Sequence, residues 1–538
     1  MKKRSANIVI MILLIIITIE VPINIILLSH NPSRIETEER SQAFKVEMSQ
    51  LSLANTWPSN GRSICVESYD QRYPKICSDG AGGAIITWED ERSGTFGDIY
   101  VQLVNSTGDV KWVLNGVAIS TYNKSQGAPQ ISSDGVGGAV ITWHDKRNGI
   151  NPDIYAQRIN STGDVKWIVN GTAISTADDD QVVPQICSDE AGGAIIIWND
   201  YRSGANYDIY AQRINSSGNV KWITNGTAIC IEGGDQYFPQ ICSDGAGGAI
   251  IVWEDLRGSD SDIYAQYINS TGHVKWNSNG RAICTANNTQ WYTQICSDGA
   301  GGVIITWADY RNGTNFDIFA QRVDSTGNVK WSANGTVICE ANGDQETPQI
   351  CSDGAGGALI TWEDLRSGSN GDIYAQRINS TGNVKWTANG VAICTINDDQ
   401  DAPQICSDGN GGAIITWEDL RSVWEDIYAQ RINSTGHMKW ASDGVVICNA
   451  GYAQRQPQIC VGENRSTIIT WFDKRNGAHY DIYAQLIKDI PFNGDDPPSN
   501  GDDGFPFGIL LITSSIIGAI AIGTIITVLL LKKRQKIE

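Results

Sequence analysis

One unit recurs eight times along this chain with a nearly constant length. Each copy contains the pattern W-x-D-x-R, and successive anchor tryptophans lie 54 or 55 residues apart. A constant period of this size indicates one supersecondary element copied into an array, with hardly any insertion between copies. The anchor tryptophans are Trp88, Trp143, Trp198, Trp253, Trp307, Trp362, Trp417 and Trp471.

The copy that begins at Pro403 shows what one unit can fold into. Apolar runs rich in β-branched residues, and one run that alternates apolar with polar, predict strands. Stretches rich in Gly, Asn and Asp predict tight turns between them, and no segment has helical periodicity. The expected extended segments are residues 404–407, 413–417, 426–432, 437–440 and 445–448, and the expected turns are 408–412 and 433–436.

About four short strands per unit match a blade of a β-propeller. The chain ends are complementary, because Trp57–Gly61 matches Trp440–Gly444 whereas the last copy stops after Asp481–Gln485. The N-terminal piece would therefore supply the outer strand that the last copy lacks, and this clasp would leave no open sheet edge. An open β-solenoid is the alternative. The sequence predicts an all-β fold, a closed eight-bladed propeller over residues 57–488.

Both ends of the chain carry membrane signals. Basic residues 2–4 precede an apolar run, which is typical of a signal peptide, but Glu20 and Pro22 interrupt that run, so an uncleaved signal anchor is the alternative. Residues 508–531 carry no charge and are long enough to span a bilayer, and basic residues follow at once. We therefore expect a single-pass protein of the cell membrane with an extracellular ectodomain. The expected order is 1–29 signal peptide or signal anchor, 30–56 linker, 57–488 propeller, 489–507 acidic Pro/Gly stalk, 508–531 transmembrane helix and 532–538 cytoplasmic basic tail.

The charge balance excludes one class of partner. The formal net charge is −20, and the basic ends contribute +3 each, so the part between them carries about −26. Phosphate backbones need positive protein surfaces, which argues against nucleic acid. A strongly acidic surface mainly favours solubility, with cation binding or a high-salt habitat as the lesser interpretation.

The 13 cysteines occupy two positions of the unit, separated by 12 residues. One copy has Ser120 and Ser132 instead, so both cysteines are absent together, as a covalent pair predicts; another has Ser175 with Cys187. Disulfides fit an exported protein, and the alternative is two small buried residues on neighbouring strands. The predicted pairs are Cys65/Cys77, Cys230/Cys242, Cys284/Cys296, Cys339/Cys351, Cys394/Cys406 and Cys448/Cys460.

Other recurring residues are expected to hold the fold. A second tryptophan, of which Trp112 is an example, recurs in each copy, and large aromatics repeated in register favour packing between blades. Asp90, Arg92 and Asp98 also recur in all eight copies, and an acid–Arg–acid set can fix a loop by bidentate hydrogen bonds.

The pattern D-x-R-x-G-x-x-D-I-Y after an apolar strand resembles the repeats of TolB-type β-propellers over about half of each unit. The Trp112-type strand and the cysteines depart from that family. The segments W-E-D-x-R-S-G and D-I-Y-A-Q-R-I-N look closer to repeats of secreted microbial surface proteins, and the C-terminus is similar to the anchors of archaeal surface proteins. The S-D-G-x-G-G turn resembles the sialidase Asp-box only loosely. These resemblances imply a fold and a location, not a reaction.

Candidate binding residues are those that break the repeat. Exposed aromatic residues on loops suit contacts with sugars or proteins, although packing within the loops is the alternative. No catalytic residue, cofactor or metal ligand is assigned, and calcium at the Asp-Gly-Ala-Gly-Gly turns is a minor hypothesis. Several Asn-x-Ser/Thr sequons lie in a repeated turn and make glycosylation plausible in an exported protein. The candidate ligand contacts are Tyr237, Phe238, Trp291, Tyr292 and Trp424.

The leading hypothesis is a membrane-anchored extracellular propeller that binds a surface glycan or protein, and not an enzyme. One alternative is a polysaccharide-active enzyme that uses carboxylates at the mouth of the channel as acid and base. A pair of acids with no counterpart in the other blades would favour it. The other alternative is a purely structural coat protein, which the sequence does not separate from the binding protein.

Overall fold

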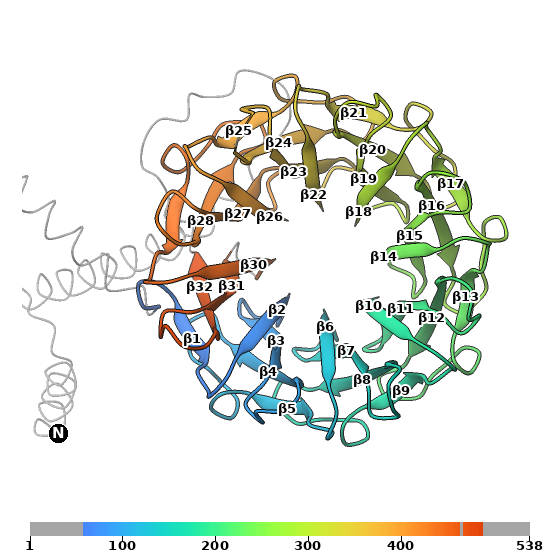
Figure 1. Cartoon of the computed structure of the whole chain (residues 1–538), viewed down its shortest axis with the longest axis vertical. Coiled ribbons are helices and arrows are strands. Elements are labelled where there is room, and N and C mark those ends of the chain that lie inside the picture. Colours follow the sequence, from blue (N-terminus) through green and yellow to red (C-terminus); the bar gives the residue numbers. More distant parts are fainter. Residues whose placement is uncertain (1–56, 369, 463–465, 488–538) are drawn as a thin grey trace, which may run out of the picture. The chain divides into compact units, whose positions relative to one another are not determined.

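The computed structural model describes residues 57–368, 370–462 and 466–487. They form eight four-stranded antiparallel sheets arranged as the blades of a ring (Figure 1). The predicted eight-bladed propeller is confirmed. The predicted signal segment, linker, stalk, transmembrane helix and cytoplasmic tail lie outside the described residues. Within the described ranges, no helix combines the length and apolar character that a bilayer crossing requires.

Each blade runs from an inner strand beside the centre of the ring to an outer strand at its rim. Blades 1 to 8 are numbered by their inner strands in chain order. The inner strands are β2 (Gln71–Ser78), β6 (Gln126–Ser133), β10 (Gln181–Ser188), β14 (Gln236–Ser243), β18 (Gln290–Ser297), β22 (Gln345–Ser352), β26 (Gln400–Ser407) and β30 (Gln454–Val461). The second strands are β3 (Ala84–Asp90), β7 (Ala139–Asp145), β11 (Ala194–Asp200), β15 (Ala249–Asp255), β19 (Val303–Asp309), β23 (Ala358–Asp364), β27 (Ala413–Asp419) and β31 (Thr467–Asp473).

The third and fourth strands complete each blade toward the rim. The third strands are β4 (Asp98–Val104), β8 (Asp153–Ile159), β12 (Asp208–Ile214), β16 (Asp262–Ile268), β20 (Asp317–Val323), β24 (Asp372–Ile378), β28 (Asp426–Ile432) and β32 (Asp481–Ile487). The outer strands are β5 (Val117–Ser120), β9 (Thr172–Ser175), β13 (Thr227–Cys230), β17 (Arg281–Cys284), β21 (Thr336–Cys339), β25 (Val391–Cys394), β29 (Val445–Cys448) and, in blade 8, β1 (Arg62–Cys65).

Blade 8 is built from both ends of the described chain. Strand β1 pairs antiparallel with β32, and Arg62 lies opposite Ala484. Trp57, just before β1, is 5% exposed and packs against Gly108 of blade 1. The predicted clasp is therefore confirmed, and it closes the ring as the partial end copies require.

The core lies between blades. The second strands are apolar and buried along almost their whole length because a neighbouring blade covers each face, whereas a one-sided sheet would show alternation. One cluster, for example, joins Ile85 and Ile99 of blade 1 to Ile141 and Trp143 of blade 2. Since burying one such side chain contributes about 1.5–3 kcal/mol, stacking of blades dominates the stability of the ring.

Residues 437–440 do not form the predicted extended strand. They make a single bridge, between Ile432 and Met438, because the buried Gln430 side chain takes over the backbone partners there. Its Oε1 accepts the N–H of Trp440, and its Nε2 donates to the carbonyl of Ala441. This glutamine therefore ends the ladder of backbone hydrogen bonds at a point where the sequence pattern predicts another strand.

Each inner strand begins with a bulge that the sequence did not indicate. In β26 the register shifts between Asp401 and Gln404, and Ala402 has a left-handed backbone with φ of 48°. The same left-handed position recurs in every blade. Non-glycine residues rarely adopt this conformation, so the eight bulges are a built feature of the central opening.

The ring has two different faces. We call loop face the one that carries the connections between second and third strands, such as 91–97, and the crossings to the next blade, such as 121–125. We call turn face the opposite one, where the first two strands join, as at 79–83, and where the third strand leads to the outer strand, as at 105–116. Symmetry is broken mainly on the loop face.

Candidate functional site

The W-x-D-x-R motif forms a similar polar network in every blade, although Arg147 of blade 2 binds Asp145 through Nη2 while its Nε has no hydrogen-bond partner. Trp88 Nε1 donates to Asp90 Oδ2 at 2.7 Å, and Arg92 donates to both Asp90 oxygens at 2.7 and 2.6 Å. The Arg92 guanidinium lies 3.8 Å from the centre of the Tyr100 ring, which stacks on Trp88. Because this Asp is fully buried, its charge is held by a bidentate ion pair.

Asp98 lies opposite Asp90 in the register of the two strands but forms no part of the ion pair. Burial, with the nearby Asp90 carboxylate, raises the pKa of Asp98 to about 6. Arg92 also donates to the carbonyl of Asn115, which ties the loop to the start of the outer strand. Eight equal copies of this network form a structural frame rather than a unique site.

The predicted disulfides are absent from the structure, in which all thirteen cysteines are free thiols. Cys394 ends the outer strand of blade 6, whereas Cys406 lies on the inner strand of blade 7. Twelve residues therefore carry the chain from the rim to the centre of the ring. The separated pairs are Cys65/Cys77, Cys230/Cys242, Cys284/Cys296, Cys339/Cys351, Cys394/Cys406 and Cys448/Cys460.

The two cysteine positions have separate structural roles. The outer thiol belongs to the polar frame, since Arg92 Nη2 lies 3.1 Å from Cys65 Sγ across a blade boundary. The inner thiol packs between blades, as Cys77 does in the cluster that contains Ile131. Serine can replace the outer cysteine without loss of the contact, because Arg202 donates to Ser175. Because the two cysteine positions are structurally independent, one copy of the repeat can have serine at one position and cysteine at the other.

The Asp-Gly-Ala-Gly-Gly turns use their carboxylates internally. Asp298 Oδ1 accepts the backbone N–H groups of Ala300 and Gly302, and Arg322 pairs with Asp298 Oδ2 at 2.9 Å. The part of the chain that the structure describes contains no group of three or more His, Cys, Asp or Glu residues able to hold a metal ion. These turns therefore serve as anchors between strands.

All five candidate ligand contacts lie on the loop face. Tyr237 and Trp291 each follow the buried glutamine of an inner strand, and Phe238 and Tyr292 are the left-handed bulge residues beside them. Trp424 lies in the connection of blade 7, against Tyr452 at a centroid distance of 5.7 Å. Four of the five are more than a third exposed: Phe238 56%, Trp291 42%, Tyr292 44% and Trp424 48%.

The aromatic residues of blades 3 to 5 form two ladders that end at the bulges. Tyr201, Tyr207, Tyr237 and Phe238 stack in sequence with centroid distances of 4.9, 5.6 and 5.8 Å. A second ladder has distances of 4.9, 5.5 and 6.5 Å, and it consists of Tyr310, Phe316, Trp291 and Tyr292. In each ladder, the residues farther from the central opening pack against one another, whereas the last residue, at the bulge, is exposed.

A cluster of carboxyl groups adjoins the second ladder. In blade 6 Glu346 lies opposite Glu363, and in blade 7 Asp401 lies opposite Glu418. Like charges directly across a ladder are unfavourable. The other six blades place no two acids here; blade 1, for example, pairs Arg72 with Glu89. We call Glu346, Glu363, Asp401 and Glu418 the acidic cluster.

Burial raises the pKa of all four carboxyl groups. Burial, together with the Asp401 and Glu346 carboxylates, raises the pKa of Glu363 to about 7. Burial and Asp401 raise the pKa of Glu418 to about 7, and burial raises that of Asp401 to about 6. Tyr292 lies close enough to Glu346 and Glu363 for their charges to help burial raise its pKa. The aromatic and acidic parts are therefore continuous.

Sequence reasoning missed the acidic cluster. None of its four residues is among the candidate ligand contacts that the sequence indicated, and Glu363 stands directly before Asp364 of the repeated frame. Asp364 belongs to that frame, but the residue before the motif aspartate varies between blades and lies outside the frame. In blade 4 this residue is Glu254, whose Oε1 accepts the N–H of Tyr292 in the next blade. Comparing the residue before each motif aspartate with the residue after each inner-strand glutamine would have revealed the two acid pairs.

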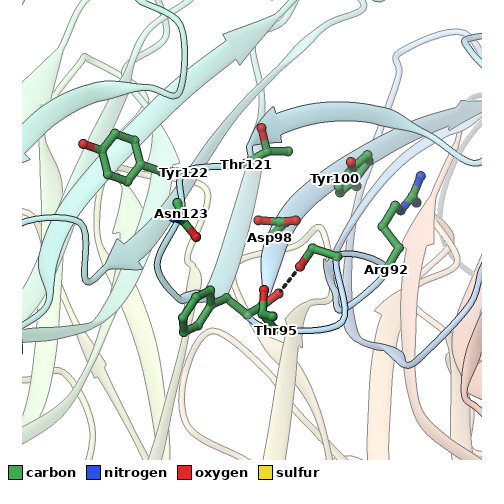
Figure 2. Close-up of a pocket in the computed structure, with 9 residues that line it drawn as sticks. Arg92, Thr95, Asp98, Tyr100, Thr121, Tyr122 and Asn123 are labelled. Carbon is green, nitrogen blue, oxygen red and sulfur yellow. Dashed lines mark hydrogen bonds between the residues drawn. The ribbon is translucent and has the colours of Figure 1, made fainter.

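Two crevices open on the loop face. One, of about 440 Å³, lies between the connection 91–97 and the crossing at Thr121–Asn123. Figure 2 shows Asp98 between Arg92 on one side and that crossing on the other. Its lining includes residues of the repeated frame, and their polar groups already make hydrogen bonds and ion pairs within the protein.

The second crevice, of about 370 Å³, lies over blades 7 and 8. It combines aromatic rings with charges of both signs, and an ion pair joins Arg455 to Glu425 inside it. Both residues influence the titration of Glu418, which places the crevice beside the acidic cluster. Its lining includes Trp424, Tyr452, Tyr480, Glu425, Arg455 and Lys474.

No protein-family model matches the chain, and no curated protein matches it in sequence. Among solved structures, an ulvan lyase is 11% identical with a TM-score of 0.41, over 72% of this chain and 98% of the other. An α-L-arabinofuranosidase from Fusarium graminearum is 10% identical with a TM-score of 0.34, over 81% and 98%. A protein of unknown function from Dyadobacter fermentans is 10% identical with a TM-score of 0.36, over 79% and 98%. The eight-bladed β-propeller seen in the sheet topology is distantly similar to glycosidase and lyase propellers and to a protein of unknown function.

Proposed function

We propose that this chain is a cell-surface binding protein whose loop face receives a glycan. The observation that carries the proposal is the loss of eightfold symmetry at one place. The frame networks repeat around the ring, whereas the acidic cluster and the exposed Phe238 and Tyr292 lie in the adjacent blades 4 to 7. Of the other bulge residues, Tyr73 of blade 1 is also an exposed aromatic. Residues that differ from blade to blade can recognise a ligand selectively.

The chemistry of this surface suits a saccharide. The C–H faces of a sugar ring pack on aromatic side chains, and its hydroxyl groups donate to carboxylates. Phe238 and Tyr292 offer open rings, and Glu346 and Asp401 supply half-buried acceptors beside them. One Asp401 oxygen, Oδ1, is buried without a hydrogen-bond partner. A donor group on a ligand would satisfy it.

The location on the cell surface rests on the sequence. The basic and apolar N-terminal segment, the uncharged stretch 508–531 and the basic tail support an anchored, exported protein. The similarity of the repeats to TolB-type propellers and to microbial surface repeats agrees with that location. Adhesion to glycans of neighbouring cells is the corresponding biological role.

The test is binding of the purified full-length chain in detergent to a broad glycan array. The double variant Phe238→Ala with Tyr292→Ala should lose at least tenfold in affinity for the glycan that the wild type binds. The control is Ile168→Ala, which removes a 69%-exposed apolar side chain from the turn face. Equal binding by both variants would contradict the proposed site, and self-association without any bound glycan would favour a structural coat protein.

A second candidate function is cleavage of a polysaccharide. The acidic cluster favours it, because carboxyl groups with pKa values of about 6 and 7 can serve as a protonated acid and an ionised base at the same pH. The channel-mouth acid pairs are the feature that separates this candidate from a pure binding protein. Release of new reducing or unsaturated ends from arrayed polysaccharides, abolished by Asp401→Asn or Glu363→Gln, would support it.

A further inference from the structure

Six copies of one asparagine-containing turn project from the turn face. In the first, Asn105 Oδ1 accepts the N–H groups of Thr107 and Asp109 at 3.1 and 2.8 Å, and Thr107 also donates its hydroxyl proton. The hydroxyl residue two positions after the asparagine is exposed in every one of the six. The six asparagines are Asn105, Asn160, Asn215, Asn269, Asn379 and Asn433.

These turns are rigidly placed. In five of the six turns the middle serine carbonyl accepts a hydrogen bond from an indole of the preceding blade, as in Trp112 Nε1 to the Ser161 carbonyl at 3.2 Å. Arg158 donates to the Ser216 carbonyl of the next turn in the same way. Because Oδ1 of each asparagine is engaged by the turn, the amide nitrogen is the atom that faces outward; Asn160 Nδ2 meets only the exposed Asp164.

We propose that these six asparagines carry N-linked oligosaccharides, which would give the propeller a sugar-bearing turn face. The co-reactant is a lipid-linked glycosyl phosphate, available to exported chains. The bond between Asn Nδ2 and the sugar C1 forms, the C1–O bond to phosphate breaks, the phosphate leaves with the electron pair, and the amide nitrogen loses one proton. The motif Asn-x-Ser/Thr supplies the acceptor chemistry.

Three other sequons lie in a different environment. Asn170, Asn225 and Asn334 have left-handed backbones with φ of 62°, 60° and 58°. Their Oδ1 atoms accept backbone N–H groups across a blade boundary, at 3.1 to 3.2 Å, from Thr121, Thr176 and Thr285. The hydroxyl residues of these three sequons, Thr172, Thr227 and Thr336, begin outer strands and are not exposed, unlike those of the six turns, so these three asparagines stay unmodified.

The chain offers its own control. The corresponding turn of blade 5 has Asp324 in place of asparagine, and Asp324 Oδ1 accepts the same two N–H groups, from Thr326 and Asn328, at 3.0 and 2.9 Å. Aspartate therefore maintains the turn but cannot be glycosylated. Asn105→Asp should remove one glycan without disturbing the fold, and Asp324→Asn should add one.

The experiment is glycopeptide mass spectrometry of the full chain purified from the membranes of its native host. The six turn peptides should carry glycans, and the peptides of Asn170, Asn225 and Asn334 should not. Asn105→Asp and Asp324→Asn should lower and raise the intact mass by one glycan. Bare turn peptides, or equal occupancy at the three interblade sites, would overturn the proposal.

Discussion

Asp401 and Glu418 lie directly opposite each other on the paired strands β26 and β27. In the neighbouring blade Glu346 and Glu363 have the same relationship. Two carboxylates at such positions repel each other when both are ionised. Burial raises the pKa values of all four, and the Asp401 charge adds to the rise at Glu363 and Glu418. The ring tolerates this repulsion in two adjacent blades only, on the face that we propose binds a ligand.

The repulsion predicts a stabilising substitution. Asp401→Asn removes one like charge, so the free energy of unfolding at pH 8 should rise by about 0.5–1 kcal/mol. Urea denaturation followed by tryptophan fluorescence measures it. Arg72→Gln is the matched control, since Arg72 lies opposite Glu89 and its loss should destabilise blade 1. A destabilising Asp401→Asn would show that the carboxylate has a partner that offsets the repulsion.

The aspartates at the start of the third strands predict the pH dependence of stability. Burial raises the pKa of seven of them to about 6 in the folded chain, above the ordinary value of 3.8. A raised pKa means that the folded state binds protons more tightly, so this stabilisation is complete below about pH 4 and is lost as pH rises through 6. The thermal midpoint should therefore be higher at pH 5 than at pH 7.5. The residues are Asp98, Asp208, Asp262, Asp317, Asp372, Asp426 and Asp481.

Replacing Asp98 and Asp372 together by Asn should reduce that pH dependence. A difference between pH 5 and pH 7.5 that is unchanged in the double variant would assign the effect to other groups, the acidic cluster first.

The polar frame predicts a large loss of stability for one arginine. Arg366 neutralises the fully buried Asp364, and Arg366→Ala leaves that charge unpaired, which should cost about 3–5 kcal/mol. The control is Arg377→Leu, because Leu103 and Leu486 occupy the equivalent position in blades 1 and 8. Chemical denaturation of both variants compares them. Losses of equal size would mean that the two arginines contribute alike.

The cysteines predict a simple chemical result. Thiol titration of the denatured chain without reductant should find all thirteen sulfhydryl groups, and Cys230→Ser should cost less than about 1 kcal/mol because Ser120 and Ser175 stand at that position in blades 1 and 2. A Cys394–Cys406 crosslink in non-reducing peptide maps would restore the disulfide interpretation that the structure contradicts.

Repetition explains which features were predictable. The tryptophan period and the turn residues predicted the blades because each was sampled eight times in one sequence, and the complementary ends predicted the clasp. The bulges were hidden, since nothing in Gln400–Pro403 marks a left-handed Ala402. The cysteine spacing misled because it spans a blade boundary. The acidic cluster depends on pairs such as Glu346 and Glu363, which only strand register brings together. The proposed membrane segments stay predictions.

The clasp of blade 8 also determines when the molecule can be completed. Strand β1 has its partner in β32, and Arg62 must wait for Ala484, which the ribosome adds 422 residues later. Contacts this distant in sequence form slowly. During synthesis the first strand is an unpaired edge, while blades 1 to 7 can assemble in order from the N-terminal side. The whole ring is therefore sealed in a single late event, and a nascent chain lacking its final seven-residue strand keeps both ends open.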